Sequence, residues 1–169
     1  LFNLNLMETV PYDKRSGKVW FNGELVNWAN AKIHVLSHGL HYASCVFEGE
    51  RVYDREIFKL EEHTDRLFYS AKRMGIVMPY SPKEINTASK EIVTVQKVKN
   101  GYVRPVVWRG SEMMAISAQK NRTHVAIASW EWGSYFDPNL KLKGIKLNVS
   151  SWRRPAPNSI PWDTKAAGL

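Results

Sequence analysis

The sequence has little cysteine: Cys45 is the single one among 169 residues. One thiol excludes an internal disulfide framework and fits a reducing compartment, so we expect a cytoplasmic protein. No apolar run in the sequence approaches the roughly 20 residues of a membrane helix. The first 18 residues lack a basic start followed by a long apolar segment, which argues against a secretory signal.

Blocks of basic residues are also missing, although Lys and Arg outnumber Asp and Glu by 24 to 16 and the net charge is +8. Nucleic-acid-binding arms carry their basic residues in runs, whereas here they are scattered. This pattern favours solvated surface with at most one anion site. A non-catalytic basic module that binds phosphate or nucleic acid stays as an alternative. Glycine-rich phosphate loops of the GxGxxG or GxxxxGK type are absent.

Two hairpins are predicted in the first third of the chain. Val19–Phe21 and Glu24–Val26 flank Asn22-Gly23, a pair that readily adopts the positive φ angles of a type I′ turn. A second pair of strands is expected at 47–53 and 57–60.

Two helices are predicted next. The spacing of apolar residues indicates an amphipathic helix over 61–74. Ser81, with Pro82 and Glu84 after it, is typical of a capping box that begins a second helix. An Asn-Gly pair at 100–101 predicts the end of that helix.

Runs of valine, isoleucine and aromatic residues predict three further strands: 102–108, 123–130 and 145–152. Hairpins, then helices, then strands indicate an α+β fold rather than repeated βαβ units. Gly, Pro and Asn at 132–139 predict an interdomain loop. It would divide a small N-terminal α/β domain, 1–131, from the start of a larger second domain, 140–169.

Lys165 follows a loop in which Thr164 is a candidate cap for a helical turn over 165–167. An uncharged lysine amine attacks carbonyl carbons, and desolvation or nearby positive charge favours the uncharged form. The positive end of a helix would supply such a charge. Lysines are more often solvated surface residues, so both interpretations stay open at this point.

Two arginines are candidates for anion binding. Arg66, on the first predicted helix, is placed either to pair with Glu62 one turn earlier or to clamp a phosphate. Arg104 lies in a predicted strand whose alternation puts it on the same face as Tyr102. A charge in an apolar strand is either paired or functional. A bound carboxylate and a structural ion pair are the two alternatives for Arg104.

Three histidines, His34, His38 and His41, cluster in the sequence, but their spacing matches no metal-ligand or hydrolase motif. We therefore expect no metal site. Cys45 stands next to apolar residues and is interpreted as a small buried hydrophobe rather than a nucleophile.

Short motifs also follow one another in a recognisable order from about residue 17 to the end. They are VWFNGE (19–24), SHGLHY (37–42), VFEGERVY (46–53), HTDRL (63–67), YVRP (102–105), WGSY (132–135), SSWRR (150–154) and DTKAAG (163–168). The series resembles the branched-chain amino acid aminotransferases, members of the fold-type IV pyridoxal-phosphate enzymes. Each motif alone is modest, and the order carries the resemblance.

The resemblance implies roles for single residues. Lys165 is similar to the lysine that holds pyridoxal 5′-phosphate as a Schiff base, and Arg66 to the residue that grips the cofactor phosphate. Arg104 is similar to the arginine that receives the distal carboxylate of glutamate or 2-oxoglutarate. The resemblance gives the walls of the substrate pocket as Phe47, Gly49, Tyr102, Trp132 and Tyr135.

The resemblance also implies a homodimer, because Tyr42 and the loop at 114–117 would reach the pocket of the neighbouring subunit. The implied reaction is transamination of leucine, isoleucine or valine with 2-oxoglutarate, which gives branched 2-oxo acids and glutamate. It uses small-molecule substrates and involves neither nucleic acid nor membrane.

The chain has about half the length that the resemblance implies, and it corresponds to the N-terminal half. A tyrosine beside the cofactor ring, the glutamate that pairs with the pyridine nitrogen and further phosphate-binding loops are expected after residue 169. D-amino acid aminotransferase and aminodeoxychorismate lyase share the fold and remain alternatives, although the segments 47–53 and 102–104 favour the branched-chain type.

Overall fold

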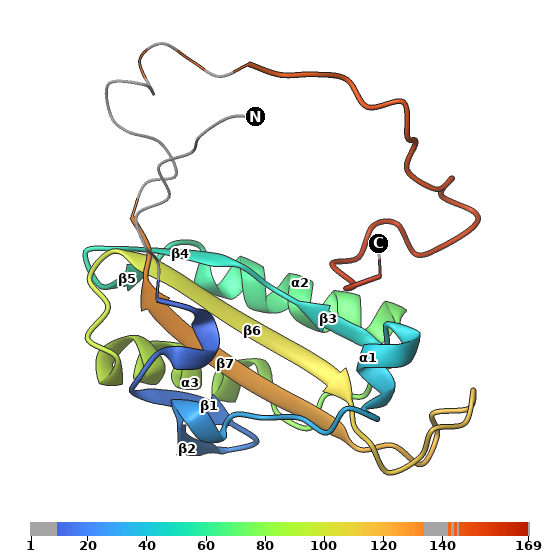
Figure 1. Ribbon diagram of the computed structural model, residues 1–169, viewed down its shortest axis with the longest axis horizontal. Coiled ribbons are helices and arrows are strands. Elements are labelled where there is room, and N and C mark those ends of the chain that lie inside the picture. The colour runs from blue at the N-terminus through green and yellow to red at the C-terminus, as the bar shows by residue number, and fades with distance from the viewer. Residues whose placement is uncertain (1–9, 134–141, 143, 145, 169) are drawn as a thin grey trace.

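The computed structural model describes residues 10–133, 142, 144 and 146–168 (Figure 1). The strands are β1 (Lys18–Phe21), β2 (Glu24–Asn27), β3 (Cys45–Phe47), β4 (Glu50–Tyr53), β5 (Glu56–Ile57), β6 (Gly101–Arg109) and β7 (Thr123–Glu131). The helices are α1 (His38–Tyr42), α2 (Leu60–Arg73) and α3 (Pro82–Val95), with 3₁₀ turns at Tyr12–Lys14 and Trp28–Asn30. This order of elements is the expected α+β one. In these described ranges no helix has the length and apolar character needed to cross a membrane.

The strands form one antiparallel sheet in the order β2-β1-β7-β6-β4-β5, and β3 also pairs with β6. β6 and β7 are nine residues long and lie at its centre. β3 and β4 pair with successive stretches of β6. Glu48 and Gly49, which join the two strands, interrupt this pairing but stay beside β6. The Glu48 N–H still donates to the Pro105 carbonyl at 2.9 Å.

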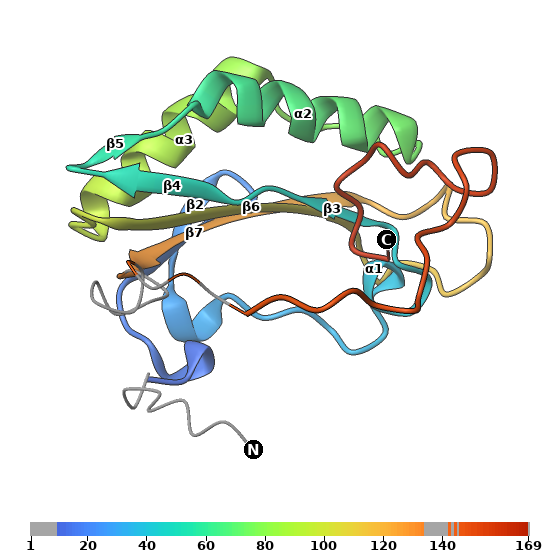
Figure 2. The same ribbon diagram turned by 90° about the horizontal axis from the view of Figure 1, so that it is seen from above.

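Helices α2 and α3 pack against one face of the sheet, while the opposite face has no helix of similar length on it in the described part of the chain (Figure 2). The main core lies between that pair of helices and the sheet. Leu67 of α2 and Ile92 of α3 are fully buried there, against Val103 and Ile127 of the central strands. Burial of this apolar area is what holds the helices on the sheet.

Two predictions based on local turn and cap chemistry are confirmed. Asn22 and Gly23 connect β1 to β2 with φ angles of 51° and 98°, as a type I′ turn requires. The capping box at α3 is formed: the Ser81 Oγ accepts from the Glu84 N–H at 3.3 Å, and the Glu84 carboxylate accepts from the Ser81 N–H at 2.7 Å.

Several predicted boundaries are wrong. The expected strand at 47–53 is two strands, because its register breaks at Glu48-Gly49. Helix α3 ends at Val95 rather than near 100, because Lys97 takes the left-handed conformation that we expected Asn-Gly to supply.

The expected strand at 145–152 is not formed by its described residues, 146–152, which pair with no neighbour and are exposed. Val and Trp favour strands only where a neighbouring strand is available to pair with them. Of the interdomain loop at 132–139, only Trp132 and Gly133 lie among the described residues. The domain bounds stay predictions.

Candidate functional site

Lys165 lies on an extended segment that runs antiparallel to β3. Ala166 bridges Val46, the Phe47 N–H donates to the Lys165 carbonyl at 3.1 Å, and the Ala167 N–H donates to the Cys45 carbonyl at 2.9 Å. The predicted helical turn over 165–167 is therefore wrong. Pairing with an open sheet edge outweighs the weak helical preference of three residues. The Lys165 Nζ lies 4.8 Å from the centre of the Phe47 ring.

Helix α2 holds the Lys165 segment from the other side. The Ser70 Oγ accepts a hydrogen bond from the Lys165 N–H at 3.0 Å. The Tyr69 hydroxyl donates to the Asp163 carboxylate, and Arg73 forms an ion pair with the same carboxylate at 3.5 Å. The hydrogen bond from Tyr69, helped by Arg73, lowers the pKa of Asp163 below its ordinary value. The backbone at Lys165 is thus fixed between β3 and α2.

Substitution of Ser70 tests this anchoring. Ser70→Ala should lower the free energy of unfolding by about 1–3 kcal/mol, because the Lys165 N–H loses its acceptor. Urea denaturation would measure the change. Ser89→Ala on α3 is the matched control, because Ser89 is equally buried but its hydroxyl has no hydrogen-bond partner within the described residues. Equal losses in both variants would contradict the anchoring role.

Arg66 lies one helical turn before Ser70 on α2, so the two side chains share one face of the helix. Its guanidinium does not pair with Glu62, which binds Lys59 instead. It donates from Nε to Glu48 Oε1 at 2.5 Å and from Nη2 to Glu48 Oε2 at 2.8 Å. The predicted anion-binding arginine is present on the helix that anchors Lys165, and one of its edges is occupied by a glutamate that sequence reasoning missed.

Glu48 is fully buried at the break between β3 and β4. Its carboxylate also contacts the His63 Nδ1 at 2.9 Å and accepts from the Gly49 N–H at 3.2 Å. Burial favours a higher pKa for Glu48, but the hydrogen bonds from Arg66 and His63 outweigh it and hold that pKa below its ordinary value. The same hydrogen bond with Glu48 raises the pKa of Arg66.

Glu50, two residues along the same edge, is in the opposite situation. Its side chain is 1% exposed, and neither of its carboxylate oxygens has a hydrogen-bond partner in the described part of the chain. Burial, and then the negative charge of Glu48, raise its pKa to about 8. Glu50 is therefore a neutral acid at pH 7, next to a glutamate that is ionised.

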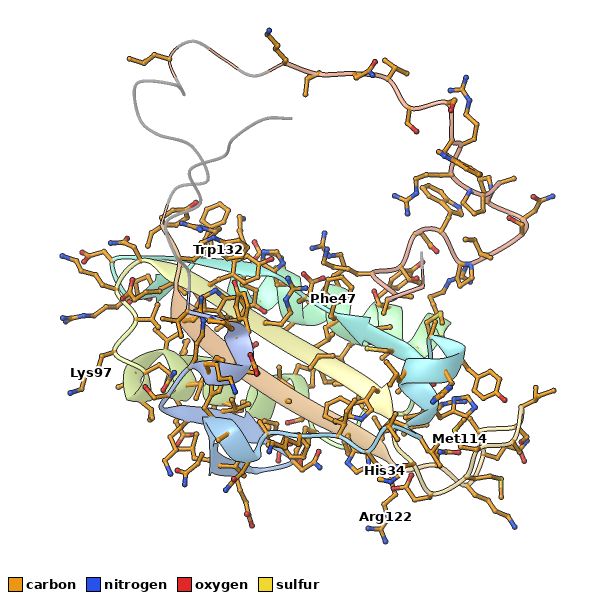
Figure 3. All side chains as sticks on the ribbon, viewed as in Figure 1. His34, Phe47, Lys97, Met114, Arg122 and Trp132 are labelled. Carbon is orange, nitrogen blue, oxygen red and sulfur yellow. The ribbon has the colours of Figure 1, made fainter. Side chains whose placement is uncertain are left out.

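The face of the sheet opposite the helices carries an aromatic cluster with one arginine. The Tyr102 ring packs 4.7 Å from Trp132 and 5.4 Å from Trp130. The Arg104 Cζ lies 4.7 Å from the Phe47 ring centre and 5.2 Å from that of Tyr102. Tyr102 and Arg104 thus lie on one face, as the alternation predicts. Figure 3 shows Phe47 and Trp132 along the same long side of the sheet.

Gly49 leaves room for this cluster. A Cβ added at Gly49 would lie 1.7 Å from the Tyr102 hydroxyl oxygen, so any side chain would displace the phenol. Arg104 forms no ion pair with any described residue, which excludes the structural ion pair for that part of the chain. Its guanidinium is held by aromatic rings and remains able to bind a carboxylate.

Tyr42, a further predicted site residue, is not brought to this cluster. Tyr42 lies on α1, nearly half exposed, with its ring 4.5 Å from His38. His38 is buried and contacts the Ala115 carbonyl at 3.1 Å, which links α1 to the loop around Met114, at the opposite end of the sheet from Trp132 (Figure 3). Tyr135 lies outside the described residues.

The three histidines act separately. His38 contacts the Ser44 hydroxyl at 2.7 Å, His41 contacts the Val35 carbonyl at 2.8 Å, and His34 accepts from the Leu36 N–H at 3.1 Å. Within the described ranges, no three His, Cys, Asp or Glu side chains come together as metal ligands would.

An apolar pocket of about 600 Å³ opens on the helix-free face, and Cys45, Val106, Trp108 and Ala167 are part of its wall. Burial raises the pKa of the Cys45 thiol to about 11, so the thiol stays protonated and behaves as a small hydrophobe. None of the predicted site residues that the structure describes lines this pocket. The pocket and the predicted site residues that the structure describes are therefore separate features of the sheet.

Comparisons with known proteins match this chain to one family of enzymes. Residues 45–167 match the family described as amino-transferase class IV. The chain is 46% identical over 144 residues to the branched-chain-amino-acid aminotransferase of Pseudomonas aeruginosa, covering 83% of this chain and 47% of that protein. It is 44% identical over 161 residues to a probable branched-chain-amino-acid aminotransferase of Rickettsia conorii, covering 95% of this chain and 54% of that protein.

Solved structures are similar as well. The branched-chain aminotransferase of the thermophilic archaeon Thermoproteus uzoniensis, solved with norvaline, superposes with a TM-score of 0.83 at 36% identity, over 91% of this chain and 51% of that one. The Escherichia coli branched-chain amino acid aminotransferase gives a TM-score of 0.82 at 37% identity, over 91% and 50%. The chain thus spans about half the length of the relatives it matches.

Proposed function

Because the chain belongs to the amino-transferase class IV family, we propose that this protein transfers the amino group of branched-chain L-amino acids to 2-oxoglutarate, with pyridoxal 5′-phosphate as its cofactor. The names of its relatives, branched-chain-amino-acid aminotransferases at 39–46% identity, support the substrate class. The observation that carries the proposal is the fixed placement of Lys165 between β3 and α2, beside Phe47 and on the side of α2 that carries Arg66.

The residues present fit such a cofactor. Lys165 offers a primary amine on a rigid backbone. Arg66 offers a guanidinium whose Nε–Nη2 edge is engaged by Glu48, while half of the side chain remains exposed. A guanidinium edge matches phosphate oxygens in a bidentate manner. These two residues would hold the aldehyde end and the phosphate end of the cofactor respectively.

Pyridoxal phosphate, when bound, supplies an electron sink for the bond that breaks at the amino acid α-carbon. The chain supplies the proton transfer. With that group bound, the Lys165 Nζ would act as the base that takes the proton from the substrate α-carbon and would hold that proton for its return. Phe47 shields one side of this amine from water. Phe47, Tyr102 and Trp132 would bury an aliphatic side chain, at roughly 0.8 kcal/mol per methylene.

Arg104 allows one pocket to bind two different substrates, leucine and 2-oxoglutarate. Leucine needs an apolar pocket, whereas 2-oxoglutarate brings a second carboxylate to the same place. Arg104 lies over Phe47 and Tyr102, so it pairs with that carboxylate and otherwise stays on the rings. One pocket thus accepts both an aliphatic and an acidic side chain.

Substitution of Arg104 tests this double use. Arg104→Gln should raise the KM for 2-oxoglutarate about 10- to 100-fold, because a charge-assisted bidentate pair is lost. The half-reaction with L-leucine should change less than threefold, on the order of 0.6 kcal/mol or less. Arg55→Gln, in the exposed turn after β4, is the control and should alter neither. Equal effects on leucine and 2-oxoglutarate would contradict the role of Arg104.

Activity assays on the purified protein, expressed from its complete gene, test the substrate class. We expect turnover of L-leucine, L-isoleucine and L-valine with 2-oxoglutarate, and none of D-alanine. Activity with D-amino acids alone, or release of pyruvate from aminodeoxychorismate, would favour one of the two alternatives on the same fold. A non-catalytic basic module would instead bind nucleic acid with a steep dependence on salt.

A homodimer and a cytoplasmic location belong to the same proposal. Several large apolar side chains are exposed around α1 and the nearby loop, as an interface with a second copy requires: Ile33, Val35, Leu36, Leu40, Tyr42 and Ile116. The lone cysteine supports a reducing compartment.

A further inference from the structure

The Arg66 guanidinium presents two usable edges, and Glu48 occupies only one of them. The Nε–Nη2 edge binds both carboxylate oxygens, at 2.5 and 2.8 Å. Among the described residues, Nη1 has no hydrogen-bond partner, and the Arg66 side chain is 50% exposed. The Nη1–Nη2 edge, which Glu48 does not span, therefore still has the Nη1 donors for an anion, while Nη2 also lies 3.4 Å from the His63 Nδ1.

The position of the Glu48 side chain is fixed by burial and by several hydrogen bonds. It is fully buried, and it receives hydrogen bonds from Arg66 twice and from the Gly49 N–H, with the His63 ring nitrogen at 2.9 Å on the same oxygen as Gly49. His63 and Arg66 are three residues apart on α2 and contact Glu48 from the same helix face. Because these hydrogen bonds hold the Glu48 carboxylate in one position, the carboxylate also holds the Arg66 guanidinium in one orientation.

We propose that Glu48 is a positioning residue, which aligns Arg66 so that the Nη1–Nη2 edge receives the cofactor phosphate, with His63 as its second support. The inference rests on the proposed function, in which Arg66 binds that phosphate. A free arginine side chain loses rotamer freedom when it binds an anion, whereas Arg66 has already lost it to Glu48. The negative charge of Glu48 lies at the neighbouring edge of the guanidinium, which shares Nη2 with the edge left for the phosphate.

The opposite role is the serious competitor. A carboxylate that neutralises Arg66 weakens its attraction for phosphate, and Glu48 would then compete with the cofactor instead of assisting it. The two roles predict opposite signs. Removal of the Glu48 charge weakens phosphate binding if Glu48 positions Arg66, and strengthens it if Glu48 competes.

The test compares pyridoxal phosphate with pyridoxal, which lacks the phosphate, on cofactor-stripped protein as its gene encodes it. Dissociation constants are measured by absorbance titration for the wild type and for Glu48→Gln, Glu48→Asp and Arg66→Gln. Glu48→Gln should weaken pyridoxal phosphate binding at least 10-fold and pyridoxal binding less than 2-fold. Glu48→Asp keeps the carboxylate and should restore most of the loss.

Controls separate positioning from general damage. Glu62→Gln removes a carboxylate from the same helix that pairs with exposed Lys59, and both affinities should stay unchanged. Far-UV circular dichroism checks that each variant is folded. If Glu48→Gln does not fold, the milder His63→Asn takes its place, with an expected 3- to 10-fold loss for pyridoxal phosphate only.

Different results test the positioning role of Glu48 and the binding of the phosphate by Arg66. A Glu48→Gln protein that binds pyridoxal phosphate as tightly as the wild type, or more tightly, overturns the positioning role. If Arg66→Gln itself leaves the ratio of the two affinities unchanged, the assignment of Arg66 to the phosphate fails. If Arg66→Gln changes the ratio and Glu48→Gln does not, only the role of Glu48 fails.

Discussion

Replacing Lys165 with alanine is expected to lower kcat/KM for transamination about 10⁴-fold, the largest loss of any single substitution in this chain. In the proposed mechanism the variant loses both the amine that would hold the cofactor and the base that would move the α-proton. Its backbone contacts remain, because the hydrogen bonds to β3 and Ser70 are made by main-chain atoms of Lys165. The loss should therefore come without a change in the free energy of unfolding larger than about 1 kcal/mol.

The measurement is a steady-state assay with L-leucine and 2-oxoglutarate, together with urea denaturation of the same samples. Lys72→Ala, an exposed lysine on α2, is the matched control and should keep full activity. Lys165→Arg keeps a positive charge but cannot hold the aldehyde, so it should be as inactive as the alanine variant. An alanine variant within 10-fold of the wild type would show that the lysine is not the reacting amine.

Glu50→Gln is expected to change how the stability of the protein depends on pH. The folded-state pKa of Glu50 is about 8, whereas an unfolded glutamate has a pKa of about 4.3. Below about pH 4.3 both states are protonated, and the contribution of Glu50 is at its most favourable. Between the two pKa values the unfolded state gains stability by releasing its proton, so the folded state loses about 1.4 kcal/mol for each pH unit until about pH 8.

The glutamine variant carries no such penalty. The difference in free energy of unfolding between the variant and the wild type should therefore rise by about 4 kcal/mol from pH 5 to pH 8, in favour of the variant. Urea denaturation at four pH values in this range would measure it. Glu56→Gln on β5 is exposed in the same hairpin and should give a flat difference. A flat difference for Glu50→Gln would mean that its carboxyl has a partner.

Features that depend on neighbouring residues in the chain could be predicted from the sequence. The turn at Asn22-Gly23 and the cap at Ser81 are determined by two to four residues, and both are formed as expected. The amphipathic pattern places α2 correctly within one residue at each end. Local chemistry and tertiary contacts agree at these elements; the Asn22 N–H, for example, also donates to the Val125 carbonyl at 2.9 Å.

Contacts between distant segments could not be predicted in the same way. Lys165 pairs with β3, more than 100 residues earlier, and nothing in 158–168 indicates an extended conformation. The sequence places Glu48 within a strand, and only the fold shows that it is buried against Arg66. One signal was available: a strand with glutamates at 48 and 50 on one face must bury them or leave them at an edge.

The prediction of the site as a whole depends on the order of the motifs. Arg104 alone leaves a bound carboxylate and a structural ion pair open, and the structure removes the ion pair for the described residues. Phe47, Tyr102 and Trp132 are brought together by β3, β6 and the end of β7, as the resemblance implies. In the proposed dimer Tyr42 would serve the second subunit, which accounts for its separation from the cluster in one chain.

The central proposal is that Lys165 would hold pyridoxal phosphate and that the amine of a branched-chain amino acid would displace it. A visible absorption spectrum tests this most directly. The purified protein, supplied with pyridoxal phosphate, should show an absorption band that shifts when L-leucine is added and does not shift with D-leucine. The band should be missing in Lys165→Ala. A protein that stays colourless with pyridoxal phosphate, or a band that Lys165→Ala retains unchanged, would contradict the account.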